Sequence, residues 1–528
     1  MSDIVQIAFN ATVAKLRTTD KDVKNFVSEL LSYTVEGVEF VASFQSGNWN
    51  GRSSFFSHAT CLFPSGFVHM VNTELTRRGY RVQLASKPRP KPLGAENPIV
   101  DEFGNDDPRY AYQLESVRKI ERHGRGILQV ATGGGKSKIA KLIVARFRRP
   151  TLFLTTRAVL MYQMADGFKA AGFKVGIIGD GDFSPTRGVN CGMVQTLVAR
   201  LKETTLKAEL LAVIGECVRK GVEATDAEKK KLAKKRFEDK ERVRKQTIAF
   251  LRMIEVVIGE EAHEAGGNSY FEILRHCKNA TIRVALTATP FMRADAEDNM
   301  RLMAAFGPVL IKVSEKQLID CGILARPIFR YVNAPPHPKL RKTSPWQRAV
   351  QLGYTENTAM HVELAREAMQ AKRLGIPVLT LVQRQKHGEA LASAYRERGL
   401  RAVFIWGEHD NAARRRALRA LAKGLIDVVI GSTIVDVGVD VPAIGLLQLA
   451  GGGKAEVALR QRIGRALRAK KFGPNVAFIS DWSCNLNHTL RDHTRQRRAI
   501  VEATPGFGEN VLPDGANFDW SIFEKRAA

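Results

Sequence analysis

The hydrophobic positions divide the chain into segments with different periodicities. From about residue 96 to 310, helical stretches separate short apolar runs that lack polar alternation, namely ILQVAT, TLFLTT, MIEVVIG and TIRVALTAT. Such runs are typical of parallel strands that helices cover on both faces. The same alternation returns at 325–480, in PVLTLV, RAVFIWG, DVVIGST and NVAFIS. The pattern therefore predicts two α/β units in tandem, connected by residues 311–330.

The first 95 residues have a different pattern, and we expect a small, separate α+β domain there. The apolar start of the chain favours a helix. Alternation before Pro64-Ser65-Gly66 predicts a strand and a turn, residues 67–78 have helical spacing, and residues 80–84 have the pattern of another strand. The segment KPRPKPLGAENP follows, and its proline and lysine content is typical of a linker.

Two further segments stand apart from the α/β units. Residues 202–250 interrupt the first unit with a polar helical pattern, and the stretch from Glu228 to Lys245 holds ten Lys or Arg and four Asp or Glu. This insertion fits either a solvated helical hairpin or a basic arm over nucleic acid. The C-terminal tail, residues 496–528, is equally consistent with a docking strap and with a frayed end.

Composition adds information about partners. The 528 residues are enough for three or four domains, and 81 Lys or Arg against 54 Asp or Glu give a net charge of +27. Such an excess indicates a polyanionic partner, most simply nucleic acid, although a merely solvated basic surface remains the alternative. The sequence shows no membrane-spanning run, no signal peptide and no CxxC pair, so we expect a cytoplasmic protein without membrane partners.

A glycine-rich segment, residues 130–137, carries the first candidate chemistry. It follows the predicted strand 126–130 and precedes the predicted helix 138–147, which is the context of a nucleotide-binding loop. Thr132, Gly133, Gly134 and Gly135 let backbone N–H groups turn toward phosphate oxygens at a helix N-terminus. Lys136 can reach the terminal phosphates of ATP, and the Ser137 hydroxyl can ligate Mg²⁺. The strict motif departs at its first position, where Val130 replaces glycine.

A pair of carboxylates follows the predicted strand 256–259. Glu260 and Glu261 would lie at the carboxyl end of that strand, where open α/β sheets bind ligands. One carboxylate can hold Mg²⁺ through water, and the next can polarise an attacking water. His263 could link this site to neighbouring elements. Alone the EExH segment is a weak signal, but it gains weight beside Lys136 on the same predicted sheet.

At this point the chain resembles superfamily 2 helicases and translocases, whose motifs occur here in the family's order. The matching segments are Tyr112-Gln113, ATGGGKS (131–137), TTRAVLMYQ (155–163), MVQTL (193–197), Glu260–His263 with Glu in place of the usual first Asp, Thr287-Ala288-Thr289, the stretch from Gly431 to Pro442, and Gln461–Arg468. The resemblance covers about residues 109–470. It implies two tandem RecA-like motor lobes, at 96–310 and 311–495.

The resemblance also implies roles for single residues. Gln113 would read adenine, Glu260 would serve the metal, and Glu261 would act on the attacking water. In the second lobe, Gln461, Arg465 and Arg468 would act on the phosphates, with the two arginines three residues apart on one helix face as arginine fingers. The remaining implied residues are Gly438 and Asp440 for nucleotide binding, His263, Thr287 and Thr289 for coupling, and Thr156, Arg157, Gln195, Thr196 and Thr433 for strand contacts.

Within the superfamily, the chain looks most like UvsW-type phage recombination helicases and XPB-type repair helicases. The segment from Phe63 to Leu84 is similar to the small duplex-binding domain that precedes the motor in those proteins. The resemblance implies an ATP- and Mg²⁺-dependent helicase acting on branched or duplex DNA, with recombination or replication proteins as further partners. A duplex translocase that does not unwind, an RNA helicase and a nucleic-acid-binding protein that does not hydrolyse ATP remain the alternatives.

Overall fold

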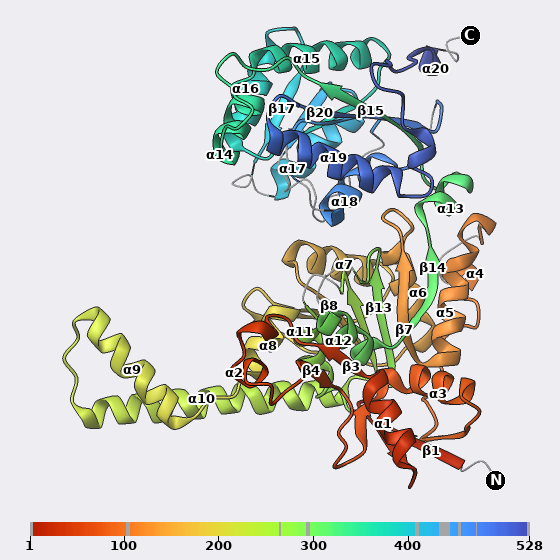
Figure 1. The fold of residues 1–528 in the computed structure, drawn as a ribbon, viewed down its shortest axis with the longest axis vertical. Coiled ribbons are helices and arrows are strands. Elements are labelled where there is room, and N and C mark those ends of the chain that lie inside the picture. Colours follow the sequence, from red (N-terminus) through yellow and green to blue (C-terminus); the bar gives the residue numbers. More distant parts are fainter. Residues whose placement is uncertain are drawn as a thin grey trace. The chain divides into compact units, whose positions relative to one another are not determined.

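The structure is a computed structural model and describes residues 4–101, 106–262, 266–291, 296–406, 411–431, 444–451, 453, 456–470 and 473–524 (Figure 1). The chain forms two compact units. One comprises Met1–Gln129 and Ser137–Lys312, and the other comprises Val130–Lys136 and Val313–Ala528. None of the helices among the described residues has the length and hydropathy that crossing a membrane requires.

The N-terminal part of the first unit is a small α+β structure. Its four-stranded sheet has the order β5-β2-β1-β6, in which β1 pairs antiparallel with β2 and parallel with β6. Its elements are β1 (Ile4–Phe9), β2 (Val13–Arg17), α1 (Lys21–Leu30), β3 (Ser32–Thr34), η1 (Val38–Phe40), α2 (Ala42–Gln45), β4 (Arg52–Ser54), β5 (Leu62–Pro64), η2 (Ser65–Phe67), α3 (Val68–Arg77) and β6 (Arg81–Ser86).

The start of the chain corrects one prediction, because it forms two strands and no helix. Val5 and Ile7 on β1, and Ala14 and Leu16 on β2, are all buried. Burial at every second residue is the period of a strand. The helix was wrongly predicted because apolar residues also occupy the other face of β1, where Ile4 is exposed.

The small N-terminal domain packs directly on a helix, α12, in the larger part of the first unit. Ala304 of α12 (Ala296–Phe306) belongs to the same buried hydrophobic cluster as Val5 and Phe67. A Cβ atom added at Gly66 would lie 2.2 Å from the carbonyl oxygen of Met303, so backbone meets backbone there. The predicted linker is likewise anchored, since Gly94 donates its N–H to the carbonyl of Arg146 at 2.9 Å. The small domain is therefore held firmly within the first unit.

The rest of the first unit is built on an eight-stranded sheet of order β10-β9-β11-β8-β12-β13-β7-β14. Registers among β7, β8, β9, β11, β12 and β13 are parallel, and β10 is antiparallel to β9. The strands are β7 (Arg125–Val130), β8 (Thr151–Thr155), β9 (Val175–Gly179), β10 (Asp182–Phe183), β11 (Val189–Met193), β12 (Val256–Glu260), β13 (Ile282–Thr287) and β14 (Val309–Val313). The helices are α4 (Pro98–Asp101), η3 (Pro108–Tyr110), α5 (Ala111–His123), α6 (Lys136–Phe147), α7 (Ala158–Ala170), α8 (Val194–Leu201), α9 (Leu206–Lys220), α10 (Asp226–Met253), α11 (Gly266–Leu274) and α12.

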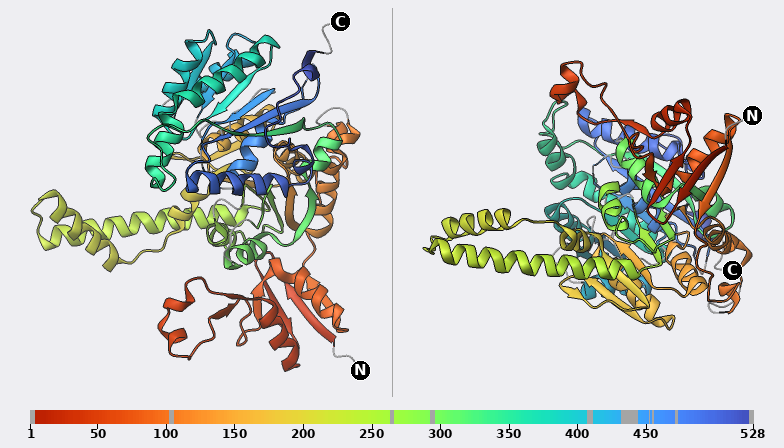
Figure 2. Two further views of the ribbon diagram at one scale, coloured as in Figure 1. Left: turned by 45° about the horizontal axis from the view of Figure 1, so that its top comes forward. Right: turned by 90° about the horizontal axis from the view of Figure 1, so that it is seen from below.

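The insertion at 202–250 is a helical hairpin made by α9 and α10, which projects away from its sheet (Figures 1 and 2). Thr225 begins α10 with a capping box to Glu228. At the base, Arg200 donates to the Thr247 hydroxyl at 3.0 Å, which ties the hairpin to α8. The polar helical pattern therefore correctly predicted a helical hairpin. Contact of its basic residues with nucleic acid stays a prediction.

The second unit has a six-stranded sheet of order β15-β20-β19-β16-β18-β17, and every neighbouring pair in it is parallel. The predicted α/β class with parallel-sheet cores is thus confirmed. The strands are β15 (Arg326–Asn333), β16 (Val378–Leu381), β17 (Ala402–Ile405), β18 (Val428–Gly431), β19 (Leu446–Leu449) and β20 (Val476–Ser483). The helices are α13 (Glu315–Asp320), α14 (Trp346–Val350), η4 (Gln351–Thr355, a π-helix), α15 (Thr358–Arg373), α16 (Gln385–Arg396), α17 (Asn411–Ala422), α18 (Glu456–Ala466), α19 (His488–Glu502), η6 (Gly508–Asn510) and α20 (Ser521–Glu524).

The C-terminal tail docks on this second sheet. The Phe518 ring stacks on Phe478 of β20 at a centroid distance of 4.3 Å, and Trp520 meets the same ring edge-on at 5.1 Å. Leu512 donates its N–H to the carbonyl of Phe329 at 2.9 Å. For residues 504–524, the structure therefore supports the docking strap and not the frayed end.

Candidate nucleotide and nucleic-acid site

The glycine-rich loop joins the carboxyl end of β7 to the first residue of α6. Gly133 and Gly135 have φ values of 88° and 80°, a left-handed backbone that side-chain-bearing residues rarely adopt. Gly134 donates to the carbonyl of Ala131 at 3.0 Å, and a Cβ at Gly134 would lie 2.6 Å from Val130 Cγ1. Both the turn and the packing therefore require small residues.

The polar residues of the loop lie where α6 begins. Lys136 is its first residue and is only 9% exposed, while Ser137 is half-buried. Thr132 is also half-buried. The loop residues 130–136 belong to the second compact unit. Within that unit, a Cβ added at Gly464 would lie 2.7 Å from the Thr132 Cβ. The N–H groups at the start of α6, with the Lys136 ammonium, can bind phosphate oxygens.

The two carboxylates at the end of β12 occupy different environments. Glu260 is the last residue of the buried strand and is 5% exposed, opposite Leu286 of β13. Its carbonyl accepts a hydrogen bond from the Tyr270 hydroxyl at 3.1 Å. Glu261 follows with φ 46°, so the chain turns sharply and this second side chain is half-buried. Glu260 is therefore the end of the strand, whereas Glu261 lies on the turn that follows it.

The segment Thr287–Thr289 lies between the glycine-rich loop and the two carboxylates along the sheet. β13 separates β12 from β7, and Thr287 is its last residue. The Thr287 hydroxyl accepts from the N–H of Thr289 at 3.2 Å, and both side chains are buried. Gln129, at the end of β7, donates its side-chain N–H to the carbonyl of Ala288 at 3.2 Å. The loop, the carboxylates and this segment therefore follow neighbouring strands at one edge of one sheet.

This edge fits a nucleotide with Mg²⁺. Mg²⁺ keeps several waters and takes only one or two protein oxygens beside phosphate oxygens, so a hydroxyl and a carboxylate suffice. Ser137 and Glu260 would supply them. Gln113, the proposed adenine reader, is a buried residue of α5, the helix that leads into β7.

The residues predicted to contact a nucleic-acid strand gather beside this edge. Thr156 and Arg157 follow β8, and Gln195 and Thr196 begin α8 directly after β11. The side-chain N–H of Gln195 donates to the carbonyl of Thr156 at 3.0 Å, so the structure brings these two segments together. Since β8 and β11 are parallel neighbours, all four residues lie at the carboxyl ends of strands.

In the second unit, the structure corrects the expected helix face for the two arginines. Helix α18 contains Gln461 and Arg465 but ends at Ala466, so Arg468 lies beyond it. Arg468 forms an antiparallel bridge with Leu324, and the N–H of Ala325 donates to the Leu467 carbonyl at 2.6 Å. These backbone contacts draw the chain out of the helix, so Arg468 does not belong to the helix that contains Arg465.

Four predicted site residues, His263, Thr433, Gly438 and Asp440, lie outside the described residues. The sequence reasoning also missed Gln129, whose amide connects the end of β7 to Ala288. Its signal was weak, because a glutamine near the end of an apolar run shows no partner in the sequence. Only the parallel register of β7 with β13 brings Gln129 opposite Thr287.

Two family models match this chain. Residues 107–292 match "Type III restriction enzyme, res subunit", and residues 360–470 match "Helicase conserved C-terminal domain". The chain is 22% identical over 475 residues to the ATP-dependent DNA helicase UvsW of Enterobacteria phage T4, covering 86% of this chain and 85% of that one. It is 29% identical to UvrABC system protein B of Thermotoga petrophila, but over only 26% of this chain and 21% of that protein.

Two solved structures are also similar to this chain. The helicase MrfA bound to DNA superposes on 79% of this chain and 52% of its own with a TM-score of 0.52 and 14% identity. A crystal structure of T4 UvsW aligns over 97% of this chain and 99% of its own, with a TM-score of 0.43 and 18% identity. The MrfA similarity supports two RecA-like parallel-sheet lobes as the fold.

Proposed function

The chain belongs to the superfamily 2 helicases and is related to UvsW, and on that premise we propose that it is an ATP-dependent DNA helicase that remodels branched or duplex DNA. Forks, D-loops and Holliday junctions would be its substrates, in recombination, repair or replication. The observation that carries the proposal is the sheet edge at which the loop before Lys136, the carboxylates Glu260 and Glu261, and the Thr287 segment follow neighbouring strands.

The relationship to UvsW favours DNA as the substrate. That match runs over most of both chains, whereas the matches to UvrABC system protein B cover about a quarter of this one. The net charge of +27 supports a polyanionic partner, because lysine and arginine contacts to phosphates dominate sequence-independent binding. We expect recombination or replication proteins as further partners, and the cytoplasm of a bacterium or a phage-infected host as the location.

In this proposal the loop and the carboxylates share the chemistry of ATP hydrolysis. Lys136 and the N–H groups at the start of α6 bind the phosphates, Gln113 contacts adenine, and bound Mg²⁺ would offset the charge that develops on the phosphates. Ser137 and Glu260 would hold the ion. Glu261 orients the attacking water and accepts its proton.

The second lobe would complete the site. Gln461, Arg465 and Arg468 stabilise phosphate charge, and Gly438 and Asp440 contact the nucleotide. His263, Thr287 and Thr289 would couple ATP hydrolysis to the residues that contact the DNA strand. We propose that Thr156, Arg157, Gln195, Thr196 and Thr433 contact the phosphate backbone of the DNA, since a motor must bind DNA of any sequence.

We assign duplex or branch recognition to residues 1–95. Because Gly66 and Phe67 pack on α12, the small domain would hold DNA at a fixed position relative to the first lobe.

A chain without residues 1–95 would keep the motor motifs but expose Met303 and Ala304. We expect it to retain basal ATPase activity, to unfold at lower temperature and to lose its preference for forks.

One experiment separates the proposal from its alternatives. ATPase activity is measured with single-stranded, duplex, forked and four-way DNA and with RNA, together with strand displacement on the same substrates. Stimulation by forked or four-way DNA with displacement supports the proposal. Stimulation by duplex without displacement would indicate a translocase, stimulation by RNA alone an RNA helicase, and no phosphate release a non-hydrolysing binding protein.

A further inference from the structure

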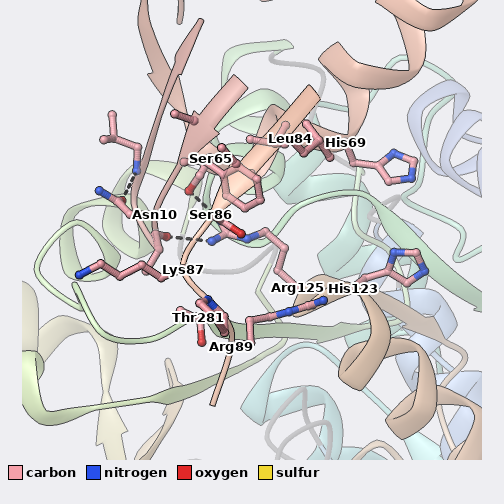
Figure 3. A pocket seen from close by; sticks show the side chains of 18 of the residues that line it. Asn10, Ser65, His69, Leu84, Ser86, Lys87, Arg89, His123, Arg125 and Thr281 are labelled. Carbon is pink, nitrogen blue, oxygen red and sulfur yellow. Dashed lines mark hydrogen bonds between the residues drawn. The ribbon is translucent and has the colours of Figure 1, made fainter. Parts of the chain in front are cut away.

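A large cavity lies within the first unit, between the N-terminal sheet and the base of the eight-stranded sheet (Figure 3). Its volume is about 1200 Å³. From the small domain it is lined by the start of β2, by the turn before α3 and by the segment after β6. From the larger sheet it is lined by residues just before β7, β12, β13 and β14, including Thr281 and Pro308. These are the amino ends of the strands, opposite the edge that bears the glycine-rich loop.

The cavity wall carries a strong excess of positive charge. Its lysines and arginines are Lys15, Lys87, Arg89, Arg122, Arg125 and Lys278. Among the described residues of the lining there is one carboxylate, that of Glu255, which forms an ion pair with Arg149 at 3.5 Å. Cations that converge on one cavity repel one another, and an anion in the cavity would relieve that repulsion.

Arg125 is the most constrained of these cations. Its two terminal nitrogens donate to neutral acceptors, the Ser65 hydroxyl at 3.0 Å and the Ala11 carbonyl at 2.9 Å (Figure 3). Among the described residues no carboxylate forms an ion pair with it. Burial lowers the pKa of Arg125 well below its usual range, and the guanidinium groups of Arg283 and Arg89 add to the effect. The fold thus fixes this charge at the cavity wall without neutralising it.

Two histidines and a second arginine line the same wall. The rings of His69 and His123 are 6.2 Å apart, and burial, His69 and nearby cations lower the pKa of His123. Arg89 donates to the Arg122 carbonyl at 2.5 Å, and it passes so close to Gly124 that a Cβ there would lie 2.6 Å from its Nη1. The local backbone therefore accommodates the Arg89 guanidinium.

We propose that this cavity binds a phosphate-bearing ligand of about mononucleotide size, either a free nucleotide or the phosphorylated end of a nucleic-acid strand. A phosphate monoester carries roughly −1.5 to −2 charge at pH 7 and three strong acceptor oxygens, which suits several convergent cations better than a carboxylate. Apolar side chains, including Phe9 and Leu84, line the remainder of the wall and can contact a sugar or base. Ligand pockets typically measure about 300–1,000 Å³, so the space is sufficient.

This site is distinct from the glycine-rich loop. Arg125 is the first residue of β7, whereas the loop follows the last residue of the same strand, so the two sites lie at opposite edges of one sheet. The proposal does not depend on the helicase function, because it rests on the charge and geometry of the cavity alone.

Binding is measured on the full chain carrying Lys136→Ala, so that the glycine-rich loop contributes little. The probes are AMP, a 5′-phosphorylated tetranucleotide and its dephosphorylated counterpart, titrated by calorimetry. We expect AMP, the phosphorylated tetranucleotide or both to bind saturably, and the dephosphorylated strand to bind at least about tenfold more weakly, since a lost charge-assisted hydrogen bond is worth about tenfold or more. Binding of AMP alone would indicate a free nucleotide, and binding of the phosphorylated strand alone a strand end.

The variant that tests the site is Lys87→Gln with Arg89→Gln, because both side chains are exposed and their loss leaves the bonds of Arg125 to Ser65 and Ala11 in place. We expect it to lower affinity at least about tenfold. The control is Arg77→Gln, an exposed arginine on α3 that pairs with Glu74 outside the cavity, and it should leave affinity unchanged. The proposal would be overturned if neither AMP nor the phosphorylated tetranucleotide bound saturably, or if both tetranucleotides bound saturably with equal affinity. Equal loss of affinity in variant and control would also overturn it.

Discussion

The backbone N–H of Glu261 donates to the carbonyl oxygen of Leu286 at 2.9 Å, which extends the parallel pairing of β12 with β13 one residue past the end of β12. Glu261 then turns into the left-handed region at φ 46°. The consequence is a buried Glu260 within the sheet and a half-buried Glu261 just beyond it. This difference in burial supports the different roles that we propose for the two carboxylates.

Glu261→Gln should bind ATP and hydrolyse it very slowly. The amide has nearly the same shape but cannot accept the proton of the attacking water, and general-base catalysis contributes about 10²–10⁴-fold. Single-turnover hydrolysis gives the rate, and nucleotide affinity is measured in parallel. Hydrolysis at the wild-type rate would remove Glu261 from the role of base.

Substitutions at Glu260 separate metal binding from a purely structural role. Glu260→Asp should remain active, because Mg²⁺ commonly keeps several waters and one of these can bridge a shorter side chain. Glu260→Ala should lose Mg²⁺-dependent hydrolysis, since Ser137 and the phosphates alone would hold the ion loosely. The measurement is ATPase rate against Mg²⁺ concentration. A Glu260→Ala protein with near-normal activity at ordinary Mg²⁺ would mean that Glu260 only ends the strand.

Gly66→Val should separate the N-terminal domain from α12. The added Cβ would lie 2.2 Å from the Met303 carbonyl oxygen and 2.3 Å from that of Ala304, and overpacking of this kind costs about 1–3 kcal/mol. Thermal unfolding should shift down, and limited proteolysis should cleave between the two parts. Gly215→Val is the control, because Gly215 lies within helix α9, has no positive φ, and its Cβ would meet nothing within 4 Å. Equal effects of the two substitutions would argue against tight docking.

His387 should make the second unit sensitive to acid. Burial lowers its pKa to about 3, with a further contribution from His361, whose ring stacks at 5.2 Å. The unfolded chain takes up this proton near pH 6.5 and the folded chain does not. Stability is therefore lost as pH falls from about 6.5 toward 3, by up to about 1.4 kcal/mol per pH unit for one group.

Comparison of wild type with His387→Gln isolates that contribution. Thermal unfolding is followed at pH 7.5 and 5.5, and the variant should lose less stability between the two pH values. Identical losses in the two proteins would show that His387 does not titrate differently on folding.

The sequence predicted the two parallel-sheet units because their signals are local, since each buried strand is a short apolar run beside a helical stretch. It did not predict strands at the start of the chain, where Ile4 and Val5 place apolar residues on both faces of β1. Nor did it show that Arg468 leaves the helix, because the cause is a bridge to Leu324, far away in the chain.

The residues of the candidate site also divide into those that the sequence identifies and those that it does not. Gly133, Gly135 and Lys136 could be identified from the sequence, since a phosphate-binding turn needs small residues at fixed spacing. The bond from Gln129 to Ala288 could not, because it depends on strand register. The cavity around Arg125 was equally inaccessible, since its cations come from segments of the chain that only the folded structure brings together.

The central claim is that ATP hydrolysis at the loop drives the remodelling of branched DNA. Its most direct test is conversion of a four-way or forked DNA by the wild-type chain and by Lys136→Ala, with Lys141→Ala as the control on the same helix, whose side chain packs near Gly167. The account predicts ATP-dependent conversion by wild type and Lys141→Ala, and loss of conversion with retained DNA binding in Lys136→Ala. Conversion by Lys136→Ala at the wild-type rate, or none by a wild-type chain that hydrolyses ATP, would contradict it.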